Sequence, residues 1–174
     1  MGERQRSFLE ASLPHLDAIY RLARRSTRDR ESAEDLVQET YLRAFAHYEE
    51  GSVENAKAWL TTICLNLARS EARRQARRPS EMPVEDLERV RTSGEDIFDQ
   101  VDAALTRGEI DAALNELPPE QKLAIVLMDL VGHSASEVAA ILACPRGTVL
   151  ARVHRGRRRL VALLAQRGIG RDVL

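Results

Sequence analysis

The residues with the clearest chemical potential are arginines near the C-terminal end of the chain. Eight arginines and no acidic residue lie between Arg146 and Arg171. Arginine guanidinium groups bind phosphate oxygens and can hold guanine O6 and N7 through two parallel hydrogen bonds. An expected helix in this segment buries its apolar side. Six of the arginines lie on its other, exposed side: Arg146, Arg152, Arg155, Arg157, Arg158 and Arg159. This segment is therefore a candidate nucleic-acid-binding surface.

A second polar and basic row is expected on a helix over residues 55–77. Steps of four, three, four and four residues keep its members on one helical face: Thr62, Asn66, Arg69, Arg73 and Arg77. Arg74 and Arg78 add charge at the C-terminal end, where the helix dipole favours cations. The same helix carries an apolar stripe for the core, made of Trp59, Leu60, Ile63 and Leu67. Such a row meets the needs of phosphate and base contacts, although an ordinary solvated face has the same pattern.

A third candidate surface is acidic and lies on an earlier helix. The pattern Ser32-Ala-Glu-Asp35 resembles a capping box, which predicts that this helix begins at Ser32. Its apolar face has Ala33, Leu36, Val37, Thr40, Tyr41, Ala44 and Phe45. The opposite face presents Asp35, Gln38, Glu39, Leu42 and Arg43. On pattern alone, a face of this kind is usually only solvated.

Two short helices must position the C-terminal arginines. The first is expected to open with a capping box, Ser134-Ala-Ser-Glu137. Residues 143–145 break it, and Pro145 suits the first turn of a new helix. The new helix buries Val149, Val153, Leu160 and Leu163. This spacing predicts a helix-turn-helix whose second helix enters the DNA major groove; a plain helical hairpin with a basic surface is the alternative.

The whole chain is expected to be all-α, with two small helical domains. Hydrophobic residues make up 44% of its 174 residues but aromatic residues only 4%, which favours cores of Leu, Ala, Val and Ile. Between Pro79 and Asp111 there are ten acidic residues against three arginines, and glycine, proline and serine interrupt the segment. The expected division is a helical domain over 1–78, an acidic linker over 79–106 and a helix-turn-helix domain over 107–174.

Enzyme classes find little support in the sequence. It has no GxSxG, P-loop, HExxH or GxGxxG motif, and its four histidines are scattered. Cys64 and Cys144 form no CxxC pair, and Cys64 is expected to be a packed thiol. No apolar run approaches the roughly 20 residues of a membrane helix. These observations predict a soluble, cytoplasmic protein with no metal, no cofactor and no membrane insertion.

Three stretches together resemble the bacterial extracytoplasmic-function (ECF) sigma factors of the sigma-70 family. They are SAEDLVQETYLRAFA at 32–46, KAWLTTICLNLARSEARRQ at 57–75, and LPPEQKLAIVLMDLVGHSASEVAAILACPRGTVLARVHRGRRRLV at 117–161. They follow the family's order and spacing, and with the acidic linker the resemblance covers nearly the whole chain. It implies a non-catalytic subunit of RNA polymerase that recognises −35 and −10 promoter elements and helps to melt the promoter. Its implied partners are core RNA polymerase (the β′ clamp helices and the β flap), promoter DNA and an anti-sigma factor.

The resemblance also implies roles for residues of the first domain. The acidic face of Asp35, Gln38, Glu39 and Leu42 matches the segment that docks on the β′ clamp helices. Residues 49–56, with Lys57 and Asn66, match the part that captures a flipped −10 base. Thr62 shares the face of Asn66, and Arg69, Arg73 and Arg74 match positions that face −10 DNA. Trp59 matches a family tryptophan, and its place on the apolar stripe assigns it to the core.

In the second domain, residues 146–158 match the helix that reads the −35 element. The implied contact residues are Arg146, Thr148, Leu150, Ala151, Arg152, His154, Arg155 and Arg158. Leu150 and Ala151 depart from the family, which commonly has Arg or Lys followed by Ser at these positions. Apolar side chains there suit thymine methyl groups, so the usual −35 sequence is not expected.

Two other functions remain open on the sequence. One is a sigma-like decoy that binds polymerase or an anti-sigma factor without reading promoters, a possibility that Leu150 and Ala151 sustain. The other is a one-component regulator with a helical sensor domain, which would need a ligand cavity or a dimer surface. The sequence names neither the promoter, nor the inducing signal, nor the type of anti-sigma factor.

Overall fold

The computed structural model describes residues 2–49, 51–77 and 108–169 of the chain. Every regular element in these ranges is helical, which confirms the predicted fold class. In chain order the elements are α1 (Glu3–Ser12), η1 (Leu13–His15), α2 (Leu16–Ser26), α3 (Arg30–Ala46), α4 (Ala56–Arg77), a helical stretch over 108–115, α6 (Pro119–Ile125), η2 (Val126–Leu130), α7 (Ala135–Leu142) and α8 (Arg146–Gln166). The acidic linker predicted over 79–106 lies outside the described residues.

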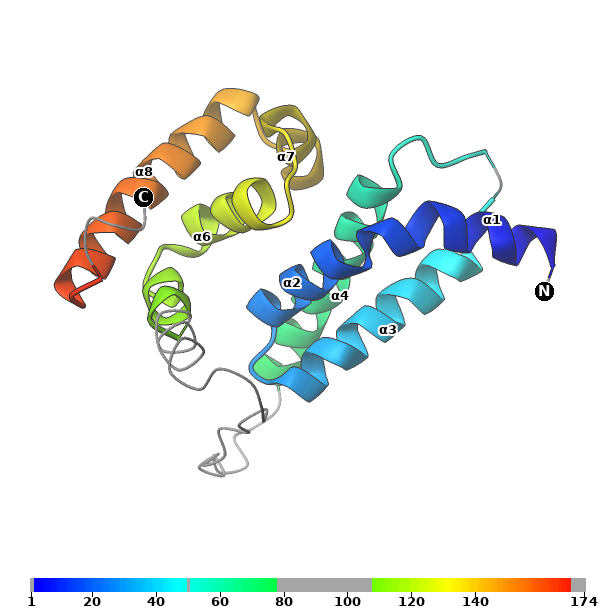
Figure 1. The fold of residues 1–174 in the computed structure, drawn as a ribbon, viewed down its shortest axis with the longest axis horizontal. Coiled ribbons are helices and arrows are strands. Elements are labelled where there is room, and N and C mark those ends of the chain that lie inside the picture. Colours follow the sequence, from blue (N-terminus) through cyan, green and yellow to red (C-terminus); the bar gives the residue numbers. More distant parts are fainter. Residues whose placement is uncertain (1, 50, 78–107, 170–174) are drawn as a thin grey trace, which may run out of the picture.

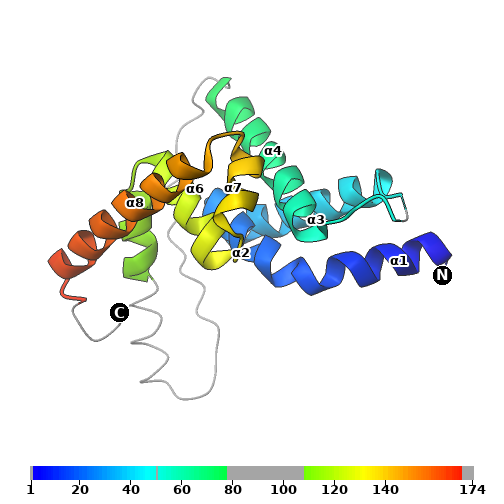
Figure 2. The ribbon, with the colours of Figure 1, turned by 90° about the horizontal axis from the view of Figure 1, so that it is seen from above.

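The helices form two groups that lie beside each other (Figure 1). The N-terminal domain, residues 2–77, holds α1 to α4, with α3 running back alongside α1 and α2. The C-terminal domain, residues 108–169, holds the 108–115 helix and α6 to α8. In Figure 2, α6 and α7 face α2 and the first turns of α4. The two domains meet where α2 packs on η2 and where α4 packs on α7.

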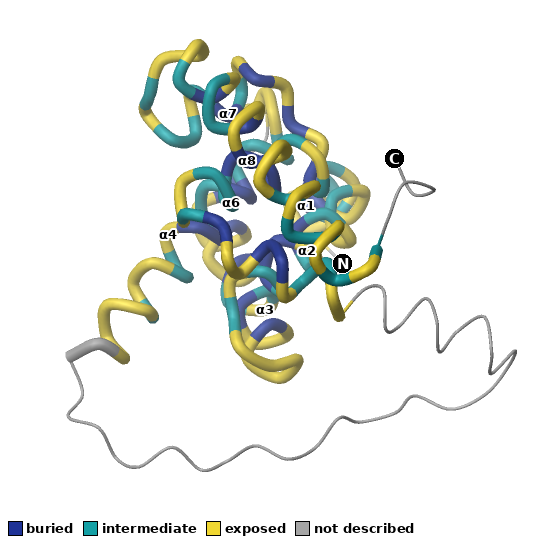
Figure 3. The backbone as a smooth tube through the Cα atoms, turned by 90° about the vertical axis from the view of Figure 1, so that its left-hand side faces the viewer, coloured by how far each residue is buried: buried dark blue, intermediate teal, exposed yellow. Residues whose placement is uncertain are grey.

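One apolar cluster runs through both domains. Its N-terminal part includes Ile19, Leu22, Leu36, Leu60 and Cys64, all at most 9% exposed. Its C-terminal part consists of small and branched side chains: Ala124, Val126, Leu127, Val131, Ala135, Val138, Val149 and Val153. A smaller cluster of Leu114, Leu117 and Ile125 fixes the 108–115 helix to α6 and α8. Figure 3 shows the buried backbone gathered in the middle of the molecule, while the C-terminal end of α4 is exposed.

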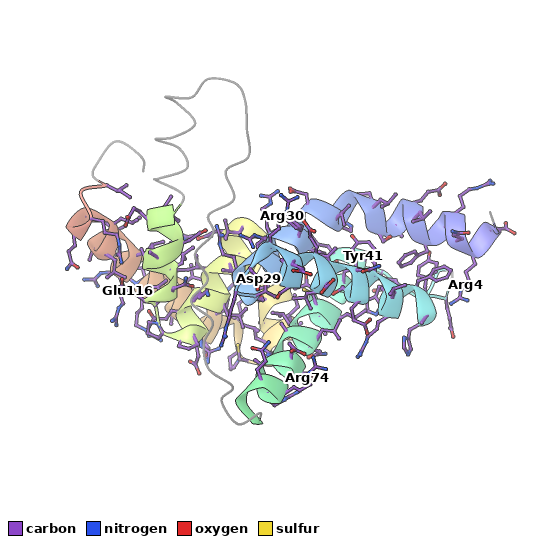
Figure 4. The ribbon with its side chains drawn as sticks, turned by 90° about the horizontal axis from the view of Figure 1, so that it is seen from below. Arg4, Asp29, Arg30, Tyr41, Arg74 and Glu116 are labelled. Atoms are coloured by element: carbon purple, nitrogen blue, oxygen red, sulfur yellow. The ribbon has the colours of Figure 1, made fainter. Side chains whose placement is uncertain are left out.

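The start of α3 differs from the sequence prediction. α3 begins at Arg30, and its N-cap is Asp29 rather than Ser32. The Asp29 carboxylate accepts hydrogen bonds from Ser32 N at 2.7 Å and Ser32 Oγ at 3.0 Å, which lowers the pKa of Asp29. Aspartate caps helices as well as serine does, and Arg30 pairs with Glu34 one turn later at 2.6 Å. The capping-box assignment to Ser32 was wrong because Asp29, three residues earlier, is an equally good cap and makes the capping hydrogen bonds. Asp29 and Arg30 are labelled in Figure 4.

The apolar stripe predicted for α4 is also only partly correct. Leu60 is fully buried, but the other fully or almost fully buried side chains of the helix are Thr61, Cys64 and Leu65. Trp59, Ile63 and Leu67 are half-buried against the same cluster. The buried face is turned because α4 packs on α2 and α3 and also on α7 of the other domain. Trp59 packs near Tyr48, with ring centroids 6.4 Å apart, as its assignment to the core requires.

Candidate nucleic-acid interface

The C-terminal domain contains the predicted helix-turn-helix. Ser134 Oγ accepts a hydrogen bond from Glu137 N at 3.2 Å, and the Glu137 carboxylate accepts one from Ser134 N at 2.7 Å, so the capping box is present. The hydrogen bonds from Ser134, with a smaller one from Asn55, lower the pKa of Glu137 to about 2. α7 ends at Leu142, and its C-cap Ala143 has a left-handed φ of 49°. Pro145 was expected in the first turn of α8. It is instead the N-cap, directly before the first helical residue Arg146, and its fixed φ suits the start of a helix.

The buried side of α8 explains how the helix is held. Val149, Val153 and Gly156 are buried, and Leu160 and Leu163 pack on the smaller cluster. Gly156 was not singled out from the sequence. A Cβ at this position would lie 2.7 Å from Ile125 Cδ1 and 3.2 Å from Gln121 Cβ, so α6 approaches α8 more closely than a larger residue permits. A glycine in the interior of a helix, where it lowers stability, was the available signal.

The outer side of α8 brings together most of the predicted −35 residues. Leu150 is 41% exposed, and Arg146, His154, Arg155 and Arg158 are exposed as well. Thr148 and Ala151 are half-buried at the edges of this surface. We call this set the α8 surface: Arg146, Thr148, Leu150, Ala151, His154, Arg155 and Arg158. It combines guanidinium donors with an apolar side chain, the two means by which a major-groove helix distinguishes bases.

Two arginines of the basic side of this helix are instead paired with acidic residues of the same domain: Arg152, which was predicted to contact the −35 element, and Arg157, which remains exposed. Arg152 Nη2 donates to Glu120 Oε2 at 2.8 Å, and its Nη1 lies 3.7 Å from Cys144 Sγ. Arg157 donates two hydrogen bonds to the Asp129 carboxylate, at 2.6 and 3.1 Å, which raise the pKa of Arg157. These pairs tie α8 to α6 and η2. The structure therefore does not place Arg152 with Arg155 on the exposed surface, and a DNA contact by Arg152 would require its pair with Glu120 to break.

The polar row of α4 is present on its exposed side. Asn66, Arg69, Arg73 and Arg74 are exposed. Thr62 is half-buried, and its hydroxyl donates to Ala58 O at 2.9 Å, so this residue lies at the margin of the row. Arg74 pairs with Glu71 at 2.9 Å and lies near the far end of the helix (Figure 4). We call Thr62, Asn66, Arg69, Arg73 and Arg74 the α4 surface.

Lys57, also predicted for −10 DNA, lies apart from the α4 surface. Its Nζ donates to Gly132 O of the C-terminal domain at 2.6 Å. Beside it, Asn55 Nδ2 donates to Glu137 Oε1 at 2.7 Å. Thr61 Oγ1 and His133 Nε2 lie 2.9 Å apart, and both residues are buried. The sequence did not show this contact, because its two sides are more than 70 residues apart in the chain.

The predicted acidic surface of α3 is exposed as expected. Asp35 and Gln38 are exposed, and Leu42 is 59% exposed, the largest fraction among the exposed large apolar side chains of the described residues. Glu39 is half-buried and pairs with Arg43 at 2.6 Å. The four predicted residues therefore share one solvent-facing side of α3, with Arg43 partly neutralising Glu39.

In the described part of the chain, two features bear on metal and thiol chemistry: the grouping of possible ligand side chains and the state of the buried cysteine. Within residues 2–49, 51–77 and 108–169, no three His, Cys, Asp or Glu side chains are grouped as a metal site requires. Burial raises the pKa of the Cys64 thiol to about 11, which confirms that it is a packed side chain. None of the described helices is both long and apolar enough to cross a membrane.

Comparison with known proteins agrees with this geometry. Residues 13–78 match the family described as Sigma-70 region 2, and residues 107–160 match Sigma-70, region 4. The chain is 38% identical over 155 residues to the ECF RNA polymerase sigma factor SigE of Mycolicibacterium smegmatis, covering 87% of this chain but 59% of SigE. It is 39% identical over 157 residues to the ECF RNA polymerase sigma factor EcfG of Rhodopseudomonas palustris, covering 88% of this chain and 81% of EcfG.

Solved structures show the same arrangement of helices. The sigma factor RpoE of Bartonella quintana, in complex with the anti-sigma factor NepR, superimposes with a TM-score of 0.64 at 31% identity, over 88% of this chain and 93% of RpoE. CnrH, in complex with the cytosolic domain of CnrY, gives a TM-score of 0.67 at 26% identity, over 93% of this chain and 90% of CnrH. The matches in sequence, domain order and fold agree, and the chain belongs to the ECF sigma factors of the sigma-70 family.

Proposed function

We propose that this protein directs transcription initiation as a promoter-specificity subunit of RNA polymerase. The observation that carries the proposal is that one chain presents two separate DNA-type surfaces. The α8 surface belongs to a helix-turn-helix and carries exposed guanidinium groups, and the α4 surface places Asn66 within a row of arginines. A protein with both surfaces can contact a promoter at two elements, whereas a simple operator-binding regulator needs only the first.

The two surfaces are proposed to act on different forms of DNA. The α8 surface reads the −35 duplex, with Arg155 on base edges and Arg146 and Arg158 on phosphates. The α4 surface, with Lys57, contacts the −10 element as its bases leave the stack. The division of the chain into 1–78, 79–106 and 107–174 follows this separation of tasks, although the middle part lies outside the described residues.

Core polymerase is proposed to bind the acidic surface of α3 through its β′ clamp helices, and the C-terminal domain through its β flap. An exposed leucine among carboxylates suits a protein contact: the leucine side chain would be buried at the centre, and the carboxylates around it would pair with positive charges of the partner. RNA synthesis itself then remains with the polymerase, so the chain supplies specificity without catalysis. Its place of action is the cytoplasm, where the polymerase works.

Control by an anti-sigma factor is part of the proposal. Its support is the likeness to RpoE, which was solved with the anti-sigma factor NepR, and to CnrH, which was solved with the cytosolic domain of CnrY. A decoy that binds such a factor without reading promoters is a second candidate, because Leu150 and Ala151 place an apolar patch at the centre of the α8 surface.

The test is RNA synthesis by core polymerase on fragmented genomic DNA, with and without the purified chain. The proposed function predicts co-elution of the chain with the core and new transcripts with defined 5′ ends. Co-elution without new transcripts would support the decoy. No co-elution would contradict the proposed function and would leave only a decoy that binds an anti-sigma factor without binding polymerase.

A further inference from the structure

The first helix, α1, lies ahead of the part of the chain that matches Sigma-70 region 2. It ends at Ser12 and the match begins at residue 13, so the match assigns no role to this helix. Side chains of α1 nevertheless reach the C-terminal end of α3, more than 40 residues further along the chain. Figure 4 shows the labelled Arg4 where α1 passes this end of α3. α1 is therefore placed to influence the loop over 47–55 that joins α3 to α4.

Arg4 caps the C-terminal end of α3. Its Nη2 donates to Phe45 O at 2.8 Å and to Ala46 O at 3.3 Å. Its Nε donates to Tyr48 O at 3.1 Å, just beyond the end of the helix. The last carbonyl groups of a helix have no partner within it and carry partial negative charge, so a guanidinium group stabilises them. Arg4 thus holds the backbone at the point where it leaves α3.

Tyr48 fixes the beginning of the loop to α1. It is only 5% exposed, and its hydroxyl lies 2.8 Å from Ser7 Oγ, within hydrogen-bond distance. The buried Phe8 ring lies edge-on to the Tyr48 ring, with centroids 5.3 Å apart, and edge-on to the Phe45 ring at 5.2 Å. Aromatic pairs attract each other in this geometry. The Trp59 ring of α4 is 6.4 Å from Tyr48, so Tyr48 is held between α1 and α4.

The rest of the loop is also held by hydrogen bonds. Ser52 N and Ser52 Oγ donate to Glu49 O, at 3.1 and 2.6 Å. Gly51 lies between them with a left-handed φ of 74°, which glycine adopts without strain. At the far end, Asn55 Oδ1 accepts a hydrogen bond from Ala58 N at 2.9 Å and caps the start of α4. Glu49, Gly51 and Ser52 remain exposed between these two fixed ends.

An ordered loop has an advantage when it must receive a base. A base that leaves the stack gains a partner only if the receiving groups are in place. Ordering a loop at the moment of binding costs conformational entropy, and this cost weakens the capture. Contacts that order the loop in the free protein remove that cost in advance.

We propose that Arg4, Ser7 and Phe8 of α1 are positioning residues for −10 base capture, because they hold the start of the 47–55 loop and so keep its exposed tip ordered before DNA binds. The assignment of this loop to DNA rests on the proposed function, whereas its attachment to α1 does not. α1 acts through the loop, so it influences promoter melting and −10 preference without changing the −35 contact.

The first measurement is amide hydrogen exchange in the full-length free chain. Arg4→Ala removes the guanidinium group from three carbonyls, so the Tyr48 and Ser52 amides should exchange roughly twofold to tenfold faster, the range for the net loss of one hydrogen bond. Arg6→Ala is the matched control. It removes the same charge from an exposed position of α1, and Arg6 makes none of the hydrogen bonds that join α1 to the end of α3.

The second measurement uses core polymerase with each form of the chain, on a promoter that the wild-type chain transcribes and on versions of it that differ at one −10 base. Arg4→Ala should lower permanganate reactivity at the −10 element by a similar factor and relax the preference among the −10 bases. Its affinity for −35 duplex should equal that of the wild type, and Arg6→Ala should match the wild type throughout. A merely structural role would lower the amount of active protein but would leave the order of base preference unchanged.

Ser7→Ala and Tyr48→Phe each remove the same hydrogen bond and provide an independent second test. Both should act in the direction of Arg4→Ala, and the double variant should have less than the sum of the two effects. Wild-type exchange in Arg4→Ala and Ser7→Ala would show that α1 does not hold the loop. Faster exchange with an unchanged order of −10 preference would overturn the positioning role. Absence of transcription by every form, the wild type included, would instead refute the proposed function and the positioning role with it, while the exchange data would still report the hold of α1 on the loop.

Discussion

Arg155 lies on the exposed side of α8, one helical turn beyond Ala151, with its guanidinium group in solvent. Arg152 and Arg157, its neighbours in sequence, are bound to Glu120 and Asp129. Their acidic partners are 32 and 28 residues away in the chain, so helical periodicity could place the arginines on the helix but could not show that they are neutralised. The base recognition proposed for α8 therefore has fewer arginines available to it than the sequence indicates.

Arg155→Ala should lower the affinity of the holoenzyme for its preferred promoter by about 1–3 kcal/mol, and the preference for one G·C pair in the −35 element should relax. The measurement is binding to a series of promoters that differ at one −35 position each. Arg159 is an exposed arginine on the flank of the same helix, and Arg159→Ala should lower the affinity for all promoters equally or not at all. The assignment fails if Arg155→Ala leaves the order of preference among the promoters unchanged.

His133 should make domain docking dependent on pH. Burial is the main cause that lowers its pKa, and the positive charges of Lys57 on α4 and His15 on η1 lower it further, against the opposing effect of Glu137 on α7. When the two domains are in contact, the His133 ring is therefore less protonated than in the separated domains, and the difference begins as the pH falls to the ordinary histidine pKa of 6.5. Docking is then fully present above that pH and weakens as the pH falls through it.

Hydrogen exchange over 131–138, corrected for the intrinsic pH dependence of exchange, should therefore show more opening at pH 5.5 than at pH 7.5. His133→Gln keeps a polar side chain without titration and should reduce this difference. Tighter docking at acid pH, or a wild-type response as flat as that of His133→Gln, would contradict the assigned role of His133.

At the scale of the helix, Gly156 decides how closely α8 approaches α6. Gly156→Ala should destabilise the protein by about 1–3 kcal/mol, because the new Cβ would overlap Ile125 and press on Gln121. Gly147→Ala is the matched control on the same helix, since no atom lies within 4 Å of a Cβ there. It should leave stability unchanged or increase it, as alanine favours helices more than glycine does. Urea denaturation of both variants is the measurement, and equal stability would contradict the packing at Gly156.

α3 gives the second prediction at this scale. Reversing the charges at Asp35 and Glu39 to lysine should weaken binding to core polymerase at least tenfold, a typical effect for charged groups at a protein contact. Circular dichroism should show the same helicity, because Asp35 is exposed and Glu39 is only half-buried at the edge of the same face. Glu34→Lys is the control, as Glu34 is exposed on the same helix but pairs with Arg30. Unchanged core affinity in the double variant would place the polymerase contact elsewhere.

Which helices form could be predicted from the sequence, because their apolar spacing and caps are local properties. The capping box at Ser134 and the break before α8 are where they were expected. The start of α3 was misplaced because Asp29 and Ser32 are both good caps, and only the hydrogen bonds of Asp29 distinguish them. The buried face of α4 is set by its packing on α2 and α3 together with α7, which no local pattern contains.

For the whole molecule, the sequence predicted which residues make up the candidate surfaces. It could not predict which of these residues are engaged in contacts with other parts of the chain. Periodicity grouped the α4 surface and the arginines of the α8 surface, and the resemblance added Thr148, Leu150, Ala151 and His154 and gave both surfaces their expected roles. The docking of the two domains, which binds Asn55 and Lys57, arises from contacts between distant segments. The net charge of −1 does not reveal the candidate surfaces either, because acidic and basic residues are concentrated in different segments of the chain.

The central claim is that one chain reads two promoter elements, and transcription from a randomised promoter library tests it most directly. Core polymerase with the wild-type chain should enrich templates that share two short sequence blocks at a fixed spacing. Asn66→Ala should keep the free energy of unfolding within about 0.5 kcal/mol, as expected for an exposed side chain, yet reduce permanganate reactivity at the downstream block. Arg155→Ala should relax the upstream block alone. Enrichment of a single block, or the same two blocks and the same melting with all three proteins, would contradict the claim.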